Sequence, residues 1–474
     1  MASGPFSMRH FRSIVLLAIL CGTTGQRLSG QAPQQMSEAA AANDWKLVES
    51  LAQSVIRSHR ADPLAWTYLG FAHSHLNQRL LAAKDFEQAV RIAPEATYSH
   101  NNYGTALEAL GRRGEAARQY EISLKLDAAQ PAAFVNLARL RAAEESPSAR
   151  RQALSLLEHA WKLAPDAEIA ATLLQLQPCA RSENRVTPPW LNLDEYAANL
   201  LKWKTQVAES TLISAAESLA NCGDVYQQAG HPEVAVPAML RSIDLAPENE
   251  LLRFRYGMLL IGTKAPKAAE IRIQEALQLF PSSTRLWFAL GLAYFDQTMP
   301  AKAQEAFDQG LKIEPKSPPL LAYRGLTALD QQHYSEAESY YRKAIAADPS
   351  SADLHCLLAE AVEKSSGDAG QVRSELKKAM AIDPRLVAAH IRLGRLELNQ
   401  GDAAAAVREL KLALALDPSQ QEIHFYLARA YQKMHDTEHA REEGRLCSEL
   451  QAANRDTERN ALKDLARRLG QTPF

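Results

Sequence analysis

Apolar side chains recur along most of the chain three and four residues apart, in runs that come in pairs. In residues 284–317, Trp287, Leu290, Gly291 and Tyr294 form one such run, and a second follows a short polar turn. Residues three and four apart lie on one face of a helix, so each run is typical of an amphipathic helix. The pattern predicts an all-α chain built from antiparallel helix pairs.

The helix pairs repeat with a period of 34 residues, and three residue types keep this period independently. They are Pro247, Pro281, Pro315 and Pro349, then Gly223, Gly257, Gly291 and Gly325, and also Ala235, Ala269, Ala303 and Ala337. Each proline ends a second helix, because it lacks an amide hydrogen and clashes with the preceding turn. The small residues at Gly291 and Ala303 let the two helices of a pair approach closely.

These positions resemble the tetratricopeptide repeat, whose pattern is W-x2-L-G-x2-Y, then A-x3-F, then a closing proline. The matching residues of 284–317 are Trp287, Leu290, Gly291, Tyr294, Ala303, Phe307 and Pro315. In register with this unit, the others are 29–62, 63–96, 97–130, 131–167, 216–249, 250–283, 318–351, 352–386, 387–420 and 421–454. The resemblance implies a right-handed superhelical solenoid whose first helices line a concave face.

Residues 168–215 interrupt the period. The paired prolines in 187–190 require a loop, and an apolar stripe from Leu193 to Val207 predicts a long helix that leads into the next unit. Two interpretations stay open. Either this irregular connector separates an N-terminal array, 31–167, from a C-terminal array, 216–454, or it is a diverged repeat that still stacks.

The last residues, 455–474, carry a further apolar stripe. It consists of Ala461, Leu462, Leu465 and Leu469, and charged residues stand between them. An array of repeats needs a solvated element at its end, because the last unit would otherwise expose its apolar face. We therefore expect a C-terminal capping helix.

The first thirty residues have the layout of a secretory signal peptide. Arg9 and Arg12 precede the apolar run 14–20, small and polar residues follow, and Glu38 is the first acidic residue. The run is too short to cross ~30 Å of hydrocarbon at ~1.5 Å per residue. We expect an exported protein, periplasmic or extracellular, with no membrane span after removal of 1–30. An ordinary N-terminal helix is the alternative.

Cys21 introduces a second alternative, a weak membrane tether through lipidation. Bulky Leu20 stands where a lipoprotein signal has a small residue, which disfavours it. The remaining cysteines are Cys179, Cys222, Cys356 and Cys447, and no C-x-x-C pair is present, which excludes a zinc ribbon or a thioredoxin motif. They are either buried free thiols or, for Cys179 and Cys222, a disulfide in an oxidising compartment.

Charge and motifs give no indication of an active site. The formal net charge is -2, so no broad basic field favours nucleic acid as a partner. The segment 257–264 superficially resembles a phosphate-binding loop, but its Thr263-Lys264 order is reversed and it lies within a predicted helix. No zinc-protease, nucleophile-elbow or dinucleotide motif occurs. We expect no catalytic residue, no cofactor and no metal, and a protein that is not an enzyme.

The resemblance also identifies which residues face the concave groove, where such arrays hold a segment of another protein. In three successive units these positions are largely apolar, namely Leu251, Phe254, Met258 and Ile261, then Arg285, Phe288, Leu292 and Phe295, then Pro319, Ala322, Leu326 and Leu329. Further along, Arg392, Arg395 and Arg429 add positive charge, with Glu360 and Glu363 between. A large apolar patch rimmed by charge marks an interaction site.

The sequence therefore predicts an exported, non-catalytic scaffold that binds a protein or peptide partner in the groove of the C-terminal array. The alternative is an auxiliary subunit of an envelope enzyme, or of a secretion or assembly complex, that delivers substrate to a catalytic partner. It also stays open whether tighter winding, or the chain's own residues 187–207, covers the groove wall.

Overall fold

The computed structural model describes residues 32–144, 146–176 and 190–453. Helices joined by short turns make up these ranges, and no β-strand occurs in them. The predicted all-α fold class is confirmed for this part of the chain.

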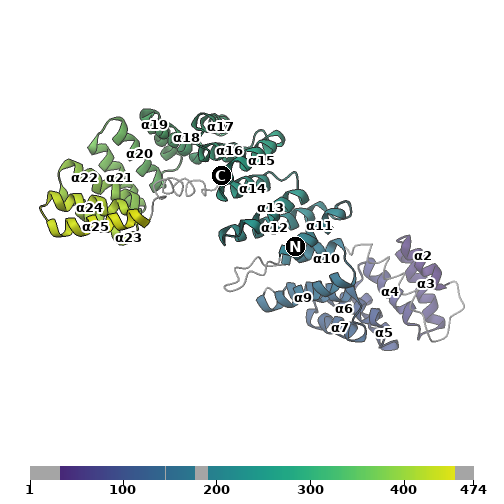
Figure 1. Cartoon of the computed structure of the whole chain (residues 1–474). Coiled ribbons are helices and arrows are strands. Elements are labelled where there is room, and N and C mark those ends of the chain that lie inside the picture. The colour runs from purple at the N-terminus through teal and green to yellow at the C-terminus, as the bar shows by residue number, and fades with distance from the viewer. Residues whose placement is uncertain (1–31, 145, 177–189, 454–474) are drawn as a thin grey trace. The chain divides into compact units, whose positions relative to one another are not determined.

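Before residue 164 the helices form four antiparallel pairs, one for each predicted unit (Figure 1). Each second helix also packs against the first helix of the next pair. The pairs are α2 (Ala32–Ala41) with α3 (Trp45–Ser58), α4 (Pro63–His75) with α5 (Arg79–Ile92), α6 (Thr97–Ala109) with α7 (Arg113–Leu126), and α8 (Pro131–Ala142) with α9 (Pro147–Leu163).

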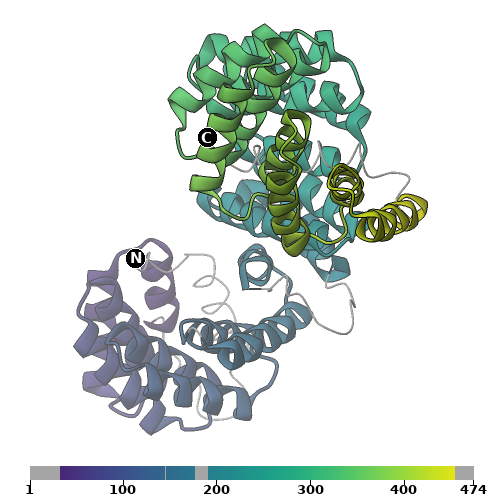
Figure 2. The same ribbon diagram turned by 90° about the vertical axis from the view of Figure 1, so that its left-hand side faces the viewer.

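From residue 250 onward the same arrangement continues, one pair to each predicted unit (Figure 2). The pairs are α14 (Glu250–Gly262) with α15 (Pro266–Leu279), α16 (Thr284–Asp296) with α17 (Pro300–Ile313), α18 (Pro318–Asp330) with α19 (Tyr334–Ala347), α20 (Ala352–Ser365) with α21 (Ala369–Ile382), α22 (Val387–Gln400) with α23 (Ala403–Leu416), and α24 (Gln421–Lys433) with α25 (Thr437–Ala453).

The irregular connector contains helices as well. α10 (Ala167–Leu176) packs against α9 and against α11 (Trp190–Lys202), and a single 3-10 turn, η1 (Lys204–Gln206), follows. The predicted helix thus ends at Lys202, before Val207. α12 (Glu209–Gln228), which also packs against α10, and α13 (Pro232–Leu245) come next. Residues 187–189 of the predicted loop lie outside the described residues.

Contacts between residues divide the chain into two compact units. The first comprises the described residues up to Ala229 together with Arg241–Pro247, and the second comprises Gly230–Leu240 and the described residues from Glu248 onward. The predicted boundary at 168–215 stays a prediction. The candidate groove residues, from Leu251 to Arg429, all belong to the second unit.

The recurring glycine lets the helices of a pair approach, as the sequence predicts. A Cβ atom built on Gly291 would lie 2.2 Å from Phe307 Cε1, and one on Gly325 would lie 2.7 Å from Tyr341 Cε1. Both rings are fully buried. The aromatic ring of the second helix therefore fills the space that the glycine of the first helix leaves open, and burial of such rings supplies much of the core.

The turn inside most pairs also repeats, because one residue there has a left-handed backbone. These residues are Asn43, Asn77, Gly111, Gly230, Lys264, Thr298, Gln332, Gly367, Gly401 and His435. The helix that follows often begins with a side-chain cap, as at Asp402, whose carboxylate accepts from the Ala405 amide at 2.9 Å. The left-handed residue stops the first helix and turns the chain back.

The predictions for three cysteines can be compared with the structure. Cys356 is a buried free thiol, as expected, and Cys447 is a partly buried one. Cys222 on α12 is buried but disulfide-bonded, so the free-thiol interpretation is wrong there. Its predicted partner, Cys179, lies outside the described residues. So do the predicted signal peptide, Cys21 and the predicted capping helix.

Candidate functional site

The predicted groove wall begins with a partly exposed apolar stripe on α14. Leu251 is 45% exposed, and Phe254, Met258 and Ile261 are partly buried. Their spacing of three, four and three residues places them on one helix face. The other face of α14 is buried and holds Leu252, Tyr256, Gly257, Leu259 and Leu260. We call the stripe on α14, with its equivalents on α16 and α18, the concave wall.

The concave wall becomes more buried on α16. Phe288 is 0% exposed and Leu292 is buried, whereas Arg285 and Phe295 are partly buried. The ring of Phe288 meets the ring of Tyr323 edge to face, with 5.2 Å between centroids. Phe288 is therefore a core residue that links α16 to α18, and a charge placed there would disturb the fold itself.

On α18 the wall is buried completely. Pro319, Ala322, Leu326 and Leu329 are all buried, and so is every residue from Pro319 through Leu329. Of the predicted wall residues, the four on α14 thus stay partly accessible, together with Arg285 and Phe295 on α16.

The three predicted basic residues of the groove, Arg392, Arg395 and Arg429, have different partners in the structure. Arg392 on α22 donates to Glu360 on α20 at 2.6 Å, and Arg395 donates to Glu363 at 2.5 Å. Arg429 on α24 is exposed, and its guanidinium carbon lies 5.7 Å from the centroid of the Phe425 ring. Arg392 and Arg395 therefore join neighbouring first helices, whereas Arg429 is exposed beside Phe425.

Burial and neighbouring positive charges shift the pKa of Glu360 in opposite directions. Burial by itself would raise the pKa of Glu360, but the Arg392 guanidinium and the Lys364 ammonium, 3.0 Å away, hold that pKa below its usual value. The carboxylate is consequently charged near neutral pH. Burial raises the pKa of the nearby Cys356 thiol and that of the Tyr341 phenol. A thiol with a raised pKa is a poor nucleophile, which argues against covalent chemistry at this cluster.

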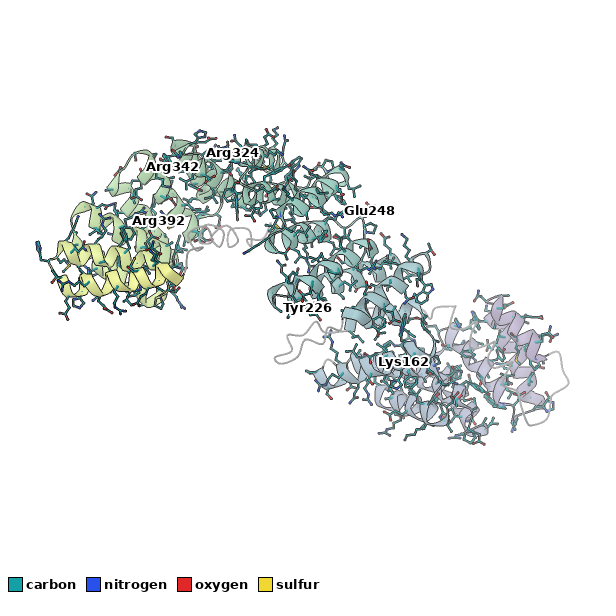
Figure 3. The ribbon with its side chains drawn as sticks, viewed as in Figure 1. Lys162, Tyr226, Glu248, Arg324, Arg342 and Arg392 are labelled. Atoms are coloured by element: carbon teal, nitrogen blue, oxygen red, sulfur yellow. The ribbon has the colours of Figure 1, made fainter. Side chains whose placement is uncertain are left out.

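Arg324, which is labelled in Figure 3, is a buried arginine that links three helices of the second unit. Arg324 on α18 is buried, with its Nε donating to Asp308 on α17 at 3.0 Å and its Nη2 donating to Glu336 on α19 at 2.6 Å. Its guanidinium also stacks over the ring of Tyr340 at 4.7 Å. Two carboxylates around one guanidinium are consistent with a structural ion-pair cluster.

The sequence prediction missed a repeated histidine–glutamate pair. His355, His390 and His424 lie on the first helices of three successive units, and all three are buried. Each also shares a hydrogen bond with a glutamate of the second helix in its unit, at 2.7, 2.9 and 2.6 Å. The partners are Glu375, Glu409 and Glu443, which are themselves 34 residues apart. That spacing was the signal that could have identified them.

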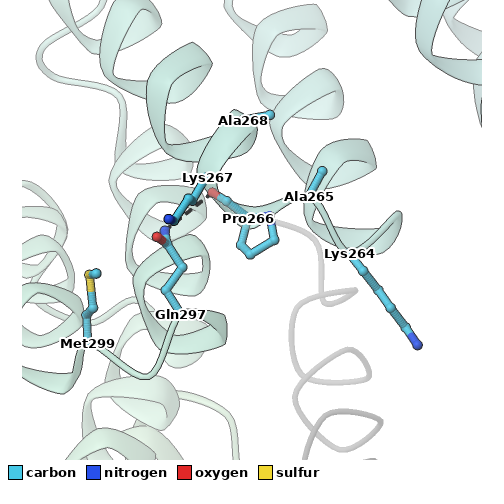
Figure 4. A pocket seen from close by; sticks show the side chains of 7 residues that line it. All are labelled: Lys264, Ala265, Pro266, Lys267, Ala268, Gln297 and Met299. Atoms are coloured by element: carbon cyan, nitrogen blue, oxygen red, sulfur yellow. Dashed lines mark hydrogen bonds between the residues drawn. The ribbon is translucent and has the colours of Figure 1, made fainter.

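Two open pockets lie on the second unit, each with a volume of about 490 Å³. The first lies at the turns after α14 and α16, where the Gln297 amide donates to the Pro266 carbonyl at 3.4 Å (Figure 4). The second lies among α15, α16 and α17, where Lys302 Nζ is 5.2 Å from the centroid of the Tyr294 ring. Neither pocket contains a residue of the concave wall or a nucleophile beside a base.

Two further tests concern metals and membranes. Across the residues that the structure describes, no group of three or more histidine, cysteine, aspartate or glutamate side chains is arranged to hold a metal ion. In the same ranges no helix combines the length and the apolar character needed to span a bilayer.

Several solved structures of low sequence identity are similar to this chain. The APC/C hetero-tetramer Cut9-Hcn1 is 11% identical, with 97% of this chain and 98% of that chain covered and a TM-score of 0.41. Yeast Tom70 is 14% identical, with 93% and 98% covered and a TM-score of 0.39. PilW, described as a type IV pilus biogenesis factor, is 21% identical, with 44% and 95% covered and a TM-score of 0.40. A comparison of the sequence with curated proteins gives no match.

Family models of the tetratricopeptide repeat match the second unit directly. One matches residues 284–317 and 318–351, and another matches residues 387–430. The helices before and after these residues pack in the same pairwise way. Residues 284–351 and 387–430 are therefore tetratricopeptide repeats.

Proposed function

We propose that this protein is a non-catalytic scaffold that captures a segment of a partner protein against its concave wall. The observation that carries the proposal is the apolar stripe on α14, where Leu251, Met258 and Ile261 share one face and stay partly accessible. An apolar stripe at this spacing fits an amphipathic helix or an extended segment with apolar side chains on one face.

At the charged end of the groove the proposal relies on one of the three predicted arginines. Arg392 and Arg395 are engaged with Glu360 and Glu363. Exposed Arg429, stacked on Phe425, is then the group that would meet a carboxylate of the bound segment. The proposal therefore places apolar contacts at α14 and a single charge-assisted contact at α24.

We further propose that the protein works outside the cytoplasm, in the periplasm or beyond the cell. Two observations support this. The N-terminal residues have the charge and apolar layout of an export signal. Cys222 is disulfide-bonded, and disulfides persist mainly in oxidising compartments.

A capture experiment tests the groove. The full chain, carrying an affinity tag, is incubated with cell-envelope extract, and recovered proteins are quantified by mass spectrometry. A variant with Leu251→Asp and Met258→Asp is compared with the wild type. We expect at least a tenfold lower recovery of the partner, because burying two carboxylates against apolar side chains is strongly unfavourable.

The control places the same two charges on the second helix of the same unit. Ile271 and Leu279 on α15 are 56% and 52% exposed, so Ile271→Asp with Leu279→Asp leaves the concave wall untouched. Equal loss in both variants, or no loss in either, would rule the groove out. Recovery of an enzyme at fixed stoichiometry would identify the chain as an auxiliary subunit instead.

A further inference from the structure

One ring nitrogen of His390 takes the place of an indole N–H group. In the unit 284–317, Trp287 donates its Nε1–H to the carbonyl of Pro281, six residues earlier, at 2.9 Å. His390 has the same position in the unit 387–420, and its Nε2 lies 3.1 Å from the carbonyl of Pro384, again six residues earlier. A carbonyl oxygen can only accept a hydrogen bond, so Nε2 of His390 carries a hydrogen.

The other ring nitrogen of His390 also faces an acceptor. Its Nδ1 lies 2.9 Å from Oε2 of Glu409 on α23. A neutral imidazole has one N–H group and one bare nitrogen, so a neutral ring here would turn a lone pair toward a carboxylate. One further proton removes this conflict. The imidazole takes it, because it is a stronger base than a carboxylate.

His100 on α6 provides a comparison within the same chain. It has the same position in the unit 97–130, and its Nε2 lies 2.8 Å from the carbonyl of Pro94, six residues earlier. Its Nδ1, however, lies 2.7 Å from the side-chain amide of Gln119 on α7. An amide can turn its NH2 group toward a bare nitrogen, so a neutral His100 keeps both hydrogen bonds. The same geometry thus occurs once with a carboxylate and once with an amide.

The other charged groups on the helices that contact α22 have their own partners or lie at the surface. The bonded groups form Glu360–Arg392 and Glu363–Arg395 with α20, Arg373–Glu397 and Glu375–Lys378 with α21, and, on α24, Lys433 with the Leu398 carbonyl and His424 with Glu443. The exposed groups are Lys377, Arg408, Lys411, Glu422 and Arg429. Among the described residues, Glu409 supplies the carboxylate that pairs with the His390 ring.

We propose that His390 and Glu409 form a proton-dependent lock between α22 and α23. A proton on His390 Nδ1 closes the lock, and loss of that proton leaves a lone pair against the carboxylate and loosens the two helices. The His390 ring is buried, so water does not take the place of the lost bond. The lock does not depend on what the groove binds.

The sign of the pH dependence follows from where the proton is held. A histidine of the unfolded chain releases its proton above about pH 6.5, whereas the folded chain retains it between two acceptors. The stability that the lock supplies is therefore complete below about pH 6.5 and is lost when a higher pH removes the proton from the folded chain. This direction is opposite to that of the Glu360–Arg392 pair, whose carboxylate has a lowered pKa.

Nuclear magnetic resonance of the full chain labelled with 15N-histidine tests the proton directly, because ring nitrogens with and without a proton give separate signals. The signals are assigned by their loss in His390→Gln and His100→Gln. At about pH 8 we expect protons on both ring nitrogens of His390, and on one nitrogen of His100 and of exposed His435. A bare ring nitrogen in His390 at that pH would overturn the proposal.

Two reciprocal substitutions exchange the partners with little change in side-chain size. Glu409→Gln gives His390 the partner of His100, and we expect the His390 ring to become neutral at about pH 8. Gln119→Glu gives His100 the partner of His390, and we expect the His100 ring to retain its second proton. If neither substitution changes the ring that it faces, the carboxylate does not hold the proton and the proposal is wrong.

Hydrogen exchange measured by mass spectrometry tests the effect on the helices. Protection is expressed as the ratio of intrinsic to observed exchange rate, which removes the direct effect of pH on exchange. Between about pH 6 and about pH 9 we expect protection of α22 and α23 to fall about tenfold in the wild type and to stay constant in Glu409→Gln. An equal fall in both proteins would overturn the proposal, because the proton would then not join the helices.

Discussion

Single atoms decide how closely the two helices of a unit approach. The Phe307 ring occupies the volume that a side chain at Gly291 would need, and a Cβ atom there would lie 2.2 Å from the ring. Phe307 is fully buried between its neighbours, so the ring has no open space into which to move. The glycine of the repeat is therefore a packing requirement and not a site of flexibility.

We predict that Gly291→Ala lowers the free energy of unfolding by about 1–3 kcal/mol, the usual cost of overpacking a core. Urea unfolding followed by circular dichroism measures the change. A second substitution, Phe307→Leu, removes part of the ring and should recover some of the loss. A Gly291→Ala variant as stable as the wild type would show that the glycine does not set the helix separation.

Gly444 provides the matched control, because it lies within α25 and, apart from its chain neighbours and the nearby backbone of its own helix, nothing lies within 4 Å of the position that its Cβ would take. Gly444→Ala should raise the stability by up to about 1 kcal/mol, since alanine favours a helix more than glycine does. We therefore expect Gly291→Ala to lower the free energy of unfolding and Gly444→Ala to raise it.

At the scale of helices, the sequence predicted the pairs because period and turn chemistry are local properties. Trp287 and Gly291 indicate a helix where α16 lies, and Pro315 indicates the end of α17, which is at Ile313. The partners of Arg392 and Arg395 were not predicted, because they depend on how two separate first helices face each other. The burial of Phe288 was missed for the same reason, since it depends on Tyr323 in the next unit.

The Glu360–Arg392 pair should make the junction of α20 and α22 sensitive to acid. Because the pKa of Glu360 is lowered in the folded chain, the pair stabilises the fold above about pH 4.3, the usual glutamate value. That stability is lost as the pH falls through the lower folded value. At pH 7, Glu360→Gln should cost about 1–3 kcal/mol, and the difference from the wild type should shrink as the pH falls below the usual glutamate pKa.

Unfolding midpoints at pH 7, 5 and 3 measure this dependence. Glu438→Gln, a change at an exposed glutamate of α25, is the control and should show no such convergence. A constant difference between Glu360→Gln and the wild type across the three pH values would contradict a charged pair.

For the whole molecule, the consequence of the fold is a surface rather than a pocket. In the described residues, buried charged side chains such as Arg324 form ion pairs, here with Asp308 and Glu336. The concave wall consists mainly of apolar side chains. Stability in such arrays is close to a sum over units and their interfaces. The concave wall can therefore diverge in sequence, and so in partner, without a change of fold.

Site-specific photo-cross-linking tests the central claim most directly. A photo-reactive phenylalanine analogue replaces Met258 on the concave wall or, as the reference position, exposed Leu279 on α15. In envelope extract we predict a cross-link from position 258 to a second protein, and none from position 279. Equal cross-linking from both positions, or cross-links from position 258 to this chain alone, would contradict the capture of a partner in the groove.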